Sequence, residues 1–258
     1  MVENADEFKT LVDIVAKLRA PDGCPWDRKQ THQSLRATFL QECYEVLAAL
    51  DSGDSAELCE ELGDLMLHIV LQAQIAAEAG EFEIADSLRS ISEKIVSRHP
   101  HVFGDKEVKD VAEVSHNWVR LKQAEKGTDE SMLAGVPREM PALGYSQEIQ
   151  NRVAQVGFDW DEDEGVIDKL AEEVNEFHKA ENAERQAEEF GDLLFTLANI
   201  ARRLNIDLEA ALRETNQRFY RRFAHMEEVC RQRGVNISDL SFGEQNTLWE
   251  EAKREVGE

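Results

Sequence analysis

The chain carries one acidic arrangement twice, and this repeat restricts the folds open to it. In the first copy, the run Glu-Leu-Gly-Asp-Leu follows an earlier acidic pair, giving Glu42, Glu45, Glu61 and Asp64. The second copy repeats this order in the run Glu-Phe-Gly-Asp-Leu, giving Glu173, Glu176, Glu189 and Asp192. Residues three apart lie on one face of a helix, so each copy predicts two acidic pairs on two neighbouring helices. A helical hairpin used twice is the expected architecture.

Each acidic set has the composition of a metal site. Four carboxylates directed toward one another across a helical seam repel unless a cation lies between them. Ligands that are all oxygen suit a hard divalent ion, so we expect Mg²⁺, with Mn²⁺ as a possible substitute. The alternative is an ordinary acidic surface, because Asp and Glu number 53 of 258 residues. The repetition of one layout favours the metal site.

A glycine lies before the aspartate in each copy, at Gly63 and Gly191. Glycine inside a helix costs about 1 kcal/mol relative to alanine. We therefore expect each glycine to allow a close approach of the neighbouring helix, which would bring the acidic pairs within range of one ion.

Nearly every segment of the chain has helical periodicity, and strand-like alternation is scarce. The sequence therefore predicts an all-α fold of two tandem domains. Helices are expected in the first half over 6–19, 33–51, 54–79, 84–98 and 107–126. In the second half they are expected over 138–155, 163–181, 183–204, 207–233 and 241–256. The run Lys126-Gly127-Thr128-Asp129-Glu130-Ser131 resembles a linker, so we place the domains at 1–127 and 128–258.

Bulk properties exclude several classes of partner. The net charge of -24 argues against nucleic acid and against an anionic membrane surface, because both need clustered cations. The longest nearly apolar stretch, Leu65 to Ala77, is too short to span a bilayer. The four cysteines have no Cys-x-x-Cys spacing, and the N-terminus does not resemble a secretory signal. A reducing cytoplasm is the expected location.

The repeat also includes basic and aromatic residues. Lys94 and Arg98 follow the first Gly-Asp, and Arg218 and Arg222 follow the second with the same spacing. Each half then closes with a Trp/Lys pair four residues apart: Trp118 and Lys122 in the first half, Trp249 and Lys253 in the second. Acidic residues that hold a metal, with basic residues nearby, describe a site for a polyphosphate. A tryptophan one turn from a lysine also suits a nucleobase and its phosphates.

Two further cations lie one helical turn before carboxylates of the second copy. Lys169 precedes Glu173, and Arg185 precedes Glu189, each by four residues. They can hold phosphate oxygens, or they can form ordinary salt bridges along one helix. Glycine-rich phosphate loops of the Walker and dinucleotide types are absent from the sequence. Phosphate recognition would therefore depend on metal and side chains.

An ordered set of motifs resembles the two-domain MazG family over residues 8 to 254. The motifs are Gly23-Cys24-Pro25-Trp26-Asp27, the two acidic sets, Arg98-His99-Pro100-His101-Val102-Phe103 and Val156-Gly157-Phe158-Asp159-Trp160. The resemblance implies an all-α nucleoside triphosphate pyrophosphohydrolase, usually a homodimer. Such an enzyme cleaves between the α- and β-phosphates with Mg²⁺ and releases a nucleoside monophosphate and pyrophosphate. The related superfamily includes dimeric dUTPases and phosphoribosyl-ATP pyrophosphatases.

The family pattern is Glu-Glu-x-x-Glu, and only the second copy is complete, with Glu172, Glu173 and Glu176. The first copy has Gln41 at the leading position, and an amide cannot act as a base. We therefore expect hydrolysis in the second domain, with Glu172, Glu173 and Glu176 as catalytic residues. The expected metal ligands are Glu173, Glu176, Glu189 and Asp192, with a possible second site at Glu42, Glu45, Glu61 and Asp64. The expected nucleotide-binding residues are Lys169, Glu172, Arg185, Arg218, Arg222, Trp249 and Lys253.

Two alternatives remain beside broad action on nucleoside triphosphates. One is a narrow enzyme for a noncanonical nucleotide or for phosphoribosyl-ATP. The other is a helical nucleotide-sensing module without catalysis, in which the acidic sets are structural. Release of pyrophosphate in the presence of Mg²⁺ separates the enzymes from the module, and a substrate panel separates the two enzymes.

Overall fold

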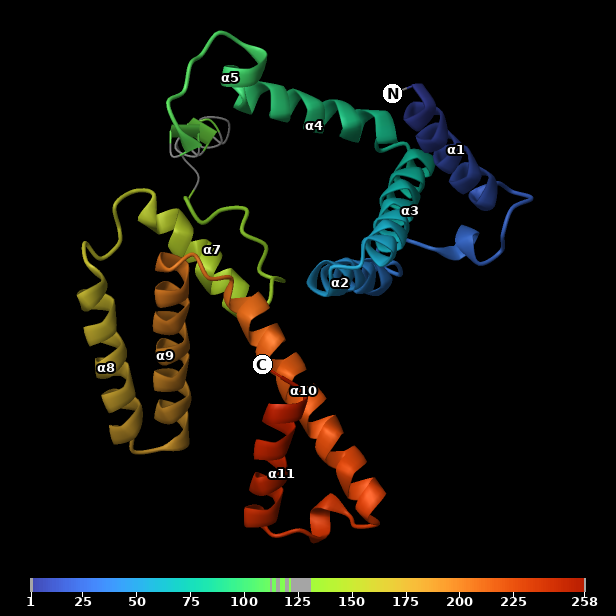
Figure 1. Cartoon of the computed structure of the whole chain (residues 1–258). Coiled ribbons are helices and arrows are strands. Elements are labelled where there is room, and N and C mark those ends of the chain that lie inside the picture. The colour runs from blue at the N-terminus through green and yellow to red at the C-terminus, as the bar shows by residue number, and fades with distance from the viewer. Residues whose placement is uncertain (1, 112, 115–116, 119–120, 122–130, 258) are drawn as a thin grey trace. The chain divides into compact units, whose positions relative to one another are not determined.

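The fold is all-α, as the periodicity predicts. The computed structural model describes residues 2–111, 113–114, 117–118, 121 and 131–257 (Figure 1). In this part of the chain every regular element is a helix and no strand occurs. The chain divides into two compact units, Met1–Gly127 and Thr128–Glu258, and each is described by itself. Within the described ranges, no helix combines the length and the apolar character that crossing a bilayer requires.

The first unit is built around a hairpin of two helices. Its elements are α1 (Val2–Arg19), η1 (Asp27–Lys29), α2 (Arg36–Ser52), α3 (Ser55–Ala79), α4 (Ile84–Arg98) and α5 (Pro100–Phe103). Helix α3 packs against both α2 and α1. The buried centre consists of Val15, Leu35, Val70 and Leu71. This packing holds α2 and α3, which carry the first acidic set, side by side.

Local signals fix where α2 and α3 meet. Gly53 takes a left-handed backbone with φ of 72° and ends α2, a conformation that costs glycine little. Asp54 then caps α3, because its side chain accepts hydrogen bonds from the backbone N–H groups of Ala56 and Glu57. Together they make a short turn that fixes the register of the hairpin.

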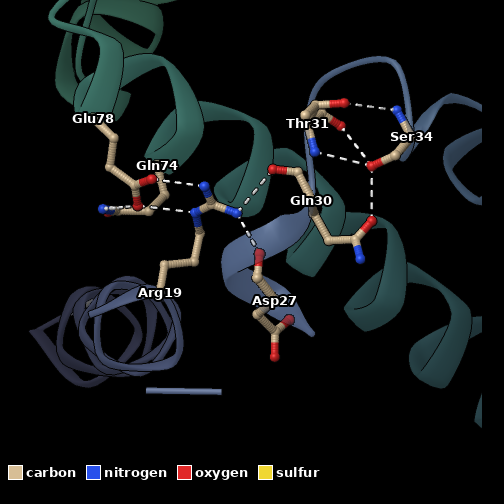
Figure 2. A network of polar contacts seen from close by, with 7 residues as sticks. All are labelled: Arg19, Asp27, Gln30, Thr31, Ser34, Gln74 and Glu78. Atoms are coloured by element: carbon tan, nitrogen blue, oxygen red, sulfur yellow. Dashed lines mark hydrogen bonds and ion pairs between the residues drawn. The ribbon is translucent and has the colours of Figure 1, made fainter. Parts of the chain in front are cut away.

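One buried arginine joins three elements of the first unit (Figure 2). The side chain of Arg19, at the end of α1, is only 6% exposed. Its Nε donates to Glu78 Oε1 at 2.9 Å and its Nη2 to Glu78 Oε2 at 2.6 Å, near the end of α3. Its Nη1 donates to the backbone carbonyls of Asp27 and Gln30. The hydrogen bond from Arg19 lowers the pKa of the Glu78 carboxyl.

The second unit contains two helical hairpins. Its elements are α7 (Ala142–Ala154), α8 (Asp163–Lys179), α9 (Ala183–Arg203), α10 (Leu208–Arg233), η2 (Ile237–Asp239) and α11 (Phe242–Glu255). Helices α8 and α9 pack against each other, and α7 packs on α9. Helix α10 pairs with α11 around a second buried centre of Met226, Cys230, Leu248 and Ala252. Figure 1 shows α10 and α11 extending away from the α8–α9 pair.

The expected helices match the structure closely where apolar periodicity and caps coincide. The largest shifts are of four residues. Helix α1, expected from 6, begins at Val2, and α7, expected from 138, begins at Ala142 because Pro141 occupies the position before its first turn. The short helix α5 and the two 3-10 turns were not expected. Of the helix expected over 107–126, residues 107–110 are not helical, whereas residues 111, 113–114, 117–118 and 121 are. The remaining residues from 112 onward lie outside the described part.

The role expected for the two glycines is wrong. A Cβ built at Gly63 or Gly191 would meet no neighbouring atom within 4 Å, so no second helix of the described part of the chain approaches either position. Both glycines lie on the exposed side of their helices.

We expect Arg19→Ala to lower the free energy of unfolding by about 3 kcal/mol, because it leaves Glu78 and two carbonyls without their donor. Denaturant unfolding measures this change. Arg89→Ala is the matched control: Arg89 forms an exposed pair with Asp86 at 2.8 Å, and its loss should cost about 1 kcal/mol or less.

The Arg19–Glu78 pair makes the stability of the fold depend on pH in a defined direction. Since the pKa of Glu78 is lowered in the folded state, its contribution is present at neutral pH and is lost as the pH falls below about 4.3, the ordinary value for glutamate. The difference between the parent and Arg19→Ala should therefore shrink in acid. A difference that stays constant down to full protonation of Glu78 contradicts this assignment.

Candidate functional site

The α8–α9 hairpin holds the second acidic set. Helix α8 ends at Lys179, and Asn182 caps α9 by accepting a hydrogen bond from the N–H of Arg185. This tight connection makes the two helices neighbours along their length. It places Glu173 of α8 and Glu189 of α9 in the interior, at 4% and 3% exposed. Two buried carboxylates on facing helices are unusual, because burial disfavours their charged form.

Three carboxylates of this hairpin converge. One oxygen each from Glu173, Glu189 and Asp192 lies within 4.8 Å of the others, and Asp192 is exposed. The second oxygen of Glu173, Oε2, is buried and has no hydrogen-bond partner. A buried carboxylate oxygen without a donor is costly unless a cation approaches it. This oxygen and the all-oxygen donor set therefore fit a divalent ion.

Two cations lie beside the buried carboxylates. Lys169 Nζ contacts Glu173 Oε1 at 2.8 Å, and Arg185 Nη2 contacts Glu189 Oε1 at 2.7 Å. The salt bridges along one helix that the sequence allowed are thus present. Hydrogen bonds with Glu173 and then with Glu172 raise the pKa of Lys169. Arg185 remains half-open to solvent, with its side chain 59% exposed, so it can also reach a ligand.

The two remaining acidic residues of α8 lie at the edge of the cluster. Glu172 is exposed and receives a hydrogen bond from Lys169 Nζ at 2.9 Å. Glu176 is exposed and is not among the three converging carboxylates. Its charge nevertheless acts on Arg185, whose pKa is raised mainly by a hydrogen bond with Glu188 and also by Glu189 and Glu176. Their catalytic and ligand roles stay predictions.

The first acidic set converges in the same way. One oxygen each from Glu42 and Glu45 of α2 and Glu61 of α3 lies within 4.8 Å of the others. Burial, followed by the hydrogen bond and charge of Glu45, raises the pKa of Glu42. Burial, followed by the charges of Glu45 and Asp64, raises the pKa of Glu61. Asp64 lies outside the converging three but is close enough to repel both.

The two sets differ in what surrounds them. One turn before Glu42 and Glu61 the first unit has Thr38 and Glu57, whereas the second has Lys169 and Arg185 in the equivalent places. Gln41 donates its amide to Glu45 Oε1 at 3.0 Å, and no such amide exists in the second set. The first set therefore carries more uncompensated negative charge.

A histidine that the sequence analysis did not select lies beside the first set. His68 Nε2 is 3.7 Å from Glu42 Oε1, and burial lowers the pKa of its imidazole. Its Nδ1 is buried without a partner. His68 follows Asp64 by four residues, so its position one turn along the same face of α3 was the available signal.

An ion pair joins the segment before α8 to the end of α9. Arg202 Nη2, near the end of α9, donates to both carboxylate oxygens of Asp159 at 2.7 Å, and Arg203 Nη1 lies 3.3 Å from the same carboxylate. Burial acts to raise the pKa of Asp159, but Arg202 and Arg203 outweigh it and lower the pKa. Arg203 also donates to the carbonyl of Trp160 at 2.7 Å. These contacts hold the segment before α8 against the end of α9.

The other expected nucleotide-binding residues lie on the α10–α11 pair. Arg222 lies over the ring of Trp249 at 5.9 Å from its centroid and donates to the carbonyl of Gly257 at 3.3 Å. Arg218 pairs with Glu214 at 3.7 Å, and Lys253 pairs with Glu250 at 2.6 Å. All four residues thus lie on the α10–α11 hairpin, whereas the acidic cluster lies on α8 and α9. Their binding role stays a prediction.

Comparisons with known proteins agree with this division into two related units. A family model described as the MazG nucleotide pyrophosphohydrolase domain matches residues 30–103. A second, described as phosphoribosyl-ATP pyrophosphohydrolase, matches residues 146–219. Each match contains one of the acidic hairpins. Fold and site together define an all-α protein of the nucleotide pyrophosphohydrolase class.

Relatives of similar length identify the family. The chain is 43% identical over 247 residues to the nucleoside triphosphate pyrophosphohydrolase/pyrophosphatase MazG of Thermotoga maritima, covering 95% of each chain. It is 38% identical over 258 residues to the nucleoside triphosphate pyrophosphohydrolase of Escherichia coli K12, covering 97% of this chain and 98% of that one. The uncharacterized protein YabN of Bacillus subtilis is 46% identical over 252 residues, which are 52% of its length. The chain belongs to the MazG family, with two tandem MazG-type domains.

A divalent ion that binds the folded cluster should raise the melting temperature, because binding to the native state alone stabilises it. We expect an upward shift with Mg²⁺ or Mn²⁺ that is much smaller in the double variant Glu189→Gln, Asp192→Asn. Calorimetry with and without the ion measures both shifts. The matched control is Glu184→Gln, Glu188→Gln, which removes the same charge from exposed positions of α9. An undiminished shift in the cluster variant would place the ion elsewhere.

Proposed function

We propose that the protein is a Mg²⁺-dependent nucleoside triphosphate pyrophosphohydrolase whose second unit carries out hydrolysis. The reaction is nucleoside triphosphate plus water to nucleoside monophosphate plus pyrophosphate. The observation that carries the proposal is the unpartnered, buried oxygen of Glu173 beside Glu189 and Asp192. Family membership supports the reaction class, since the full-length relatives from Thermotoga and Escherichia carry this activity in their names.

The residues proposed to hold the ion are Glu173, Glu176, Glu189 and Asp192. When bound, Mg²⁺ would polarise phosphate oxygens and lower the pKa of a water molecule, and Mn²⁺ could replace it. The chain's own contribution is to hold carboxylates of two helices close together. Lys169 and Arg185 contact Glu173 and Glu189 and offset part of their mutual repulsion.

Glu172 is proposed to orient or deprotonate the attacking water. Its carboxylate is 56% exposed and is held by Lys169 beside the cluster. The water oxygen forms a new bond to the α-phosphorus, and the bond from that phosphorus to the bridging oxygen breaks, so that this oxygen leaves with pyrophosphate. The proton removed from water passes to a carboxylate and then to solvent. Lys169 and Arg185 are proposed to neutralise phosphate oxygens as well, because both lie at the solvent side of the cluster.

A homodimer is proposed to complete the site. The proposed nucleotide-binding residues lie on α10 and α11, which extend away from the α8–α9 pair (Figure 1): Arg218, Arg222, Trp249 and Lys253. Large apolar side chains of the acidic hairpin are exposed in the single chain, including Ile167, Val174, Phe177 and Phe190. Exposed apolar surface of this extent favours an interface. A second copy could cover it and bring its α10–α11 pair to the phosphates.

Broad base specificity is proposed, because a flat contact with Trp249 reads no hydrogen-bond pattern. The match of residues 146–219 to the phosphoribosyl-ATP pyrophosphohydrolase model favours one second candidate, a narrow enzyme for phosphoribosyl-ATP. Comparable rates on ATP, GTP, CTP and UTP support the first candidate. Turnover of phosphoribosyl-ATP alone supports the second, and nucleotide binding without any pyrophosphate release supports a sensing module.

The proposed location is the cytoplasm, which agrees with the free state of all four cysteines. The proposed partners are nucleoside triphosphates and a second copy of the chain. Nucleic acid and membranes are not proposed partners, given the net charge of -24.

Loss of one carboxylate should affect the two units unequally. We expect Glu173→Ala or Asp192→Ala to remove most hydrolysis, at least a hundredfold in rate, because metal-ligand loss removes transition-state charge stabilisation. Glu42→Ala, the equivalent change in the first unit, should leave the rate nearly unchanged. Pyrophosphate release at saturating Mg²⁺ measures all three variants. Equal damage by Glu42→Ala and Glu173→Ala would show that activity is not confined to the second unit.

The proposed dimer makes a separate prediction for mixed variants. Asp192→Asn and Arg222→Ala should each be nearly inactive alone. After co-refolding, a mixed dimer should combine an intact cluster from one copy with an intact α10–α11 pair from the other. About one quarter of the parent rate should then return, since half of the dimers are mixed and each has one complete site. No recovery in mixed dimers would mean that both residue sets act within one chain.

A further inference from the structure

An arginine–tryptophan pair in the first unit repeats the pair proposed to bind nucleotide in the second. The guanidinium carbon of Arg98 lies 5.4 Å from the ring centroid of Trp118, and that of Arg222 lies 5.9 Å from Trp249. Both arginines lie on the helix that follows the acidic hairpin, and all four side chains are partly buried. The sequence repeat has therefore preserved a spatial arrangement, although the residues between the two partners differ.

The surroundings of the first pair suit phosphate. Lys94 lies one turn before Arg98 on α4, as Arg218 does before Arg222 on α10. Lys94 also lines an open groove of about 370 Å³ whose other residues are Phe82, Asp86, Ser87, Ser90 and Ile91. Hydroxyl groups and cations along one face of a helix can donate to phosphate oxygens. The one acidic group there, Asp86, is held by Arg89 and by the backbone N–H of Glu83.

The tryptophan ring is positioned by its neighbours. His99 meets it edge-on, with ring centroids 5.1 Å apart. The adjacent Asn117 is buried and accepts a hydrogen bond from Lys106 Nζ at 2.8 Å. This bond ties the position next to Trp118 to the segment after α5. A ring held in this way can form a flat contact with a base of any kind.

We propose that the first unit is a second nucleotide-binding site, which holds a nucleoside triphosphate through Lys94, Arg98 and Trp118 without hydrolysing it. The inference rests on the proposed function, because it transfers the binding role of the α10–α11 set to its repeat. Turnover is absent because Gln41 stands where the second unit has Glu172. The Gln41 amide is occupied with Glu45 and cannot accept a proton from water.

Equilibrium dialysis of the full chain with α,β-methylene-ATP and Mg²⁺ tests the inference, since this analogue cannot be cleaved between its α- and β-phosphates. We expect two bound nucleotides per chain in the parent. Arg98→Ala, Trp118→Phe should reduce the number to one while pyrophosphate release from ATP continues. Lys9→Ala, which removes one exposed cation from α1, should keep both. One nucleotide per chain in the parent, or two in the Arg98 variant, overturns the inference.

A second variant keeps the experiment informative if the Arg98→Ala, Trp118→Phe variant misfolds. Arg222→Ala, Lys253→Ala should lose the site of the second unit and retain one nucleotide per chain, whereas complete loss of binding overturns the inference. Pyrophosphate release by the same parent preparation separates the two proposals. Release with only one bound nucleotide contradicts the second site alone, and two bound nucleotides without release contradict the proposed hydrolysis alone.

Discussion

The crowding of carboxylates on one helical hairpin is the constraint on which the rest of the second unit depends. Glu173 and Glu189 are nearly inaccessible to water, so their charges must be balanced within the protein. Lys169 and Arg185 balance one oxygen of each, and Oε2 of Glu173 remains unpartnered. Three features hold α8 and α9 side by side: the turn between them, the packing of α7 on α9 and the Asp159–Arg202 ion pair. The carboxylates therefore stay close together although they repel one another. A folded chain of this kind is prepared for a cation.

The two units carry the same kind of acidic hairpin in different electrostatic surroundings. Both bring three carboxylates within 4.8 Å, but the first lacks the preceding cations and has an amide at Gln41. Its carboxylates respond with raised pKa values at Glu42 and Glu61. Binding of a nucleotide needs charge and contact, whereas its hydrolysis also needs a base. A glutamine at the position of Glu172, such as Gln41, can therefore allow binding without hydrolysis. The repeated arginine–tryptophan pair fits a first unit that retains binding.

Sequence alone predicted the helices and the hairpins well, since periodicity, Gly53 and the caps at Asp54 and Asn182 are local signals. The spacing of three predicted the convergence of three of the four carboxylates in each set, whereas Asp64 and Glu176 lie outside the converging groups. Contacts between distant segments were not predictable in this way: Arg19 meets Glu78, and Arg202 meets Asp159, across 59 and 43 residues. The close helix approach expected at Gly63 and Gly191 was wrong, because a glycine within a helix does not tell on which side another helix packs. His68 was missed because histidine is not a preferred ligand of the expected ion.

The central claim is that the chain splits nucleoside triphosphates between the α- and β-phosphates. Phosphorus NMR of ATP incubated with the full chain and Mg²⁺ observes every product at once. The account predicts AMP and pyrophosphate in equal amounts from the first turnovers, without ADP or orthophosphate. Formation of ADP with orthophosphate, or unchanged ATP at protein concentrations that bind it, would contradict the account.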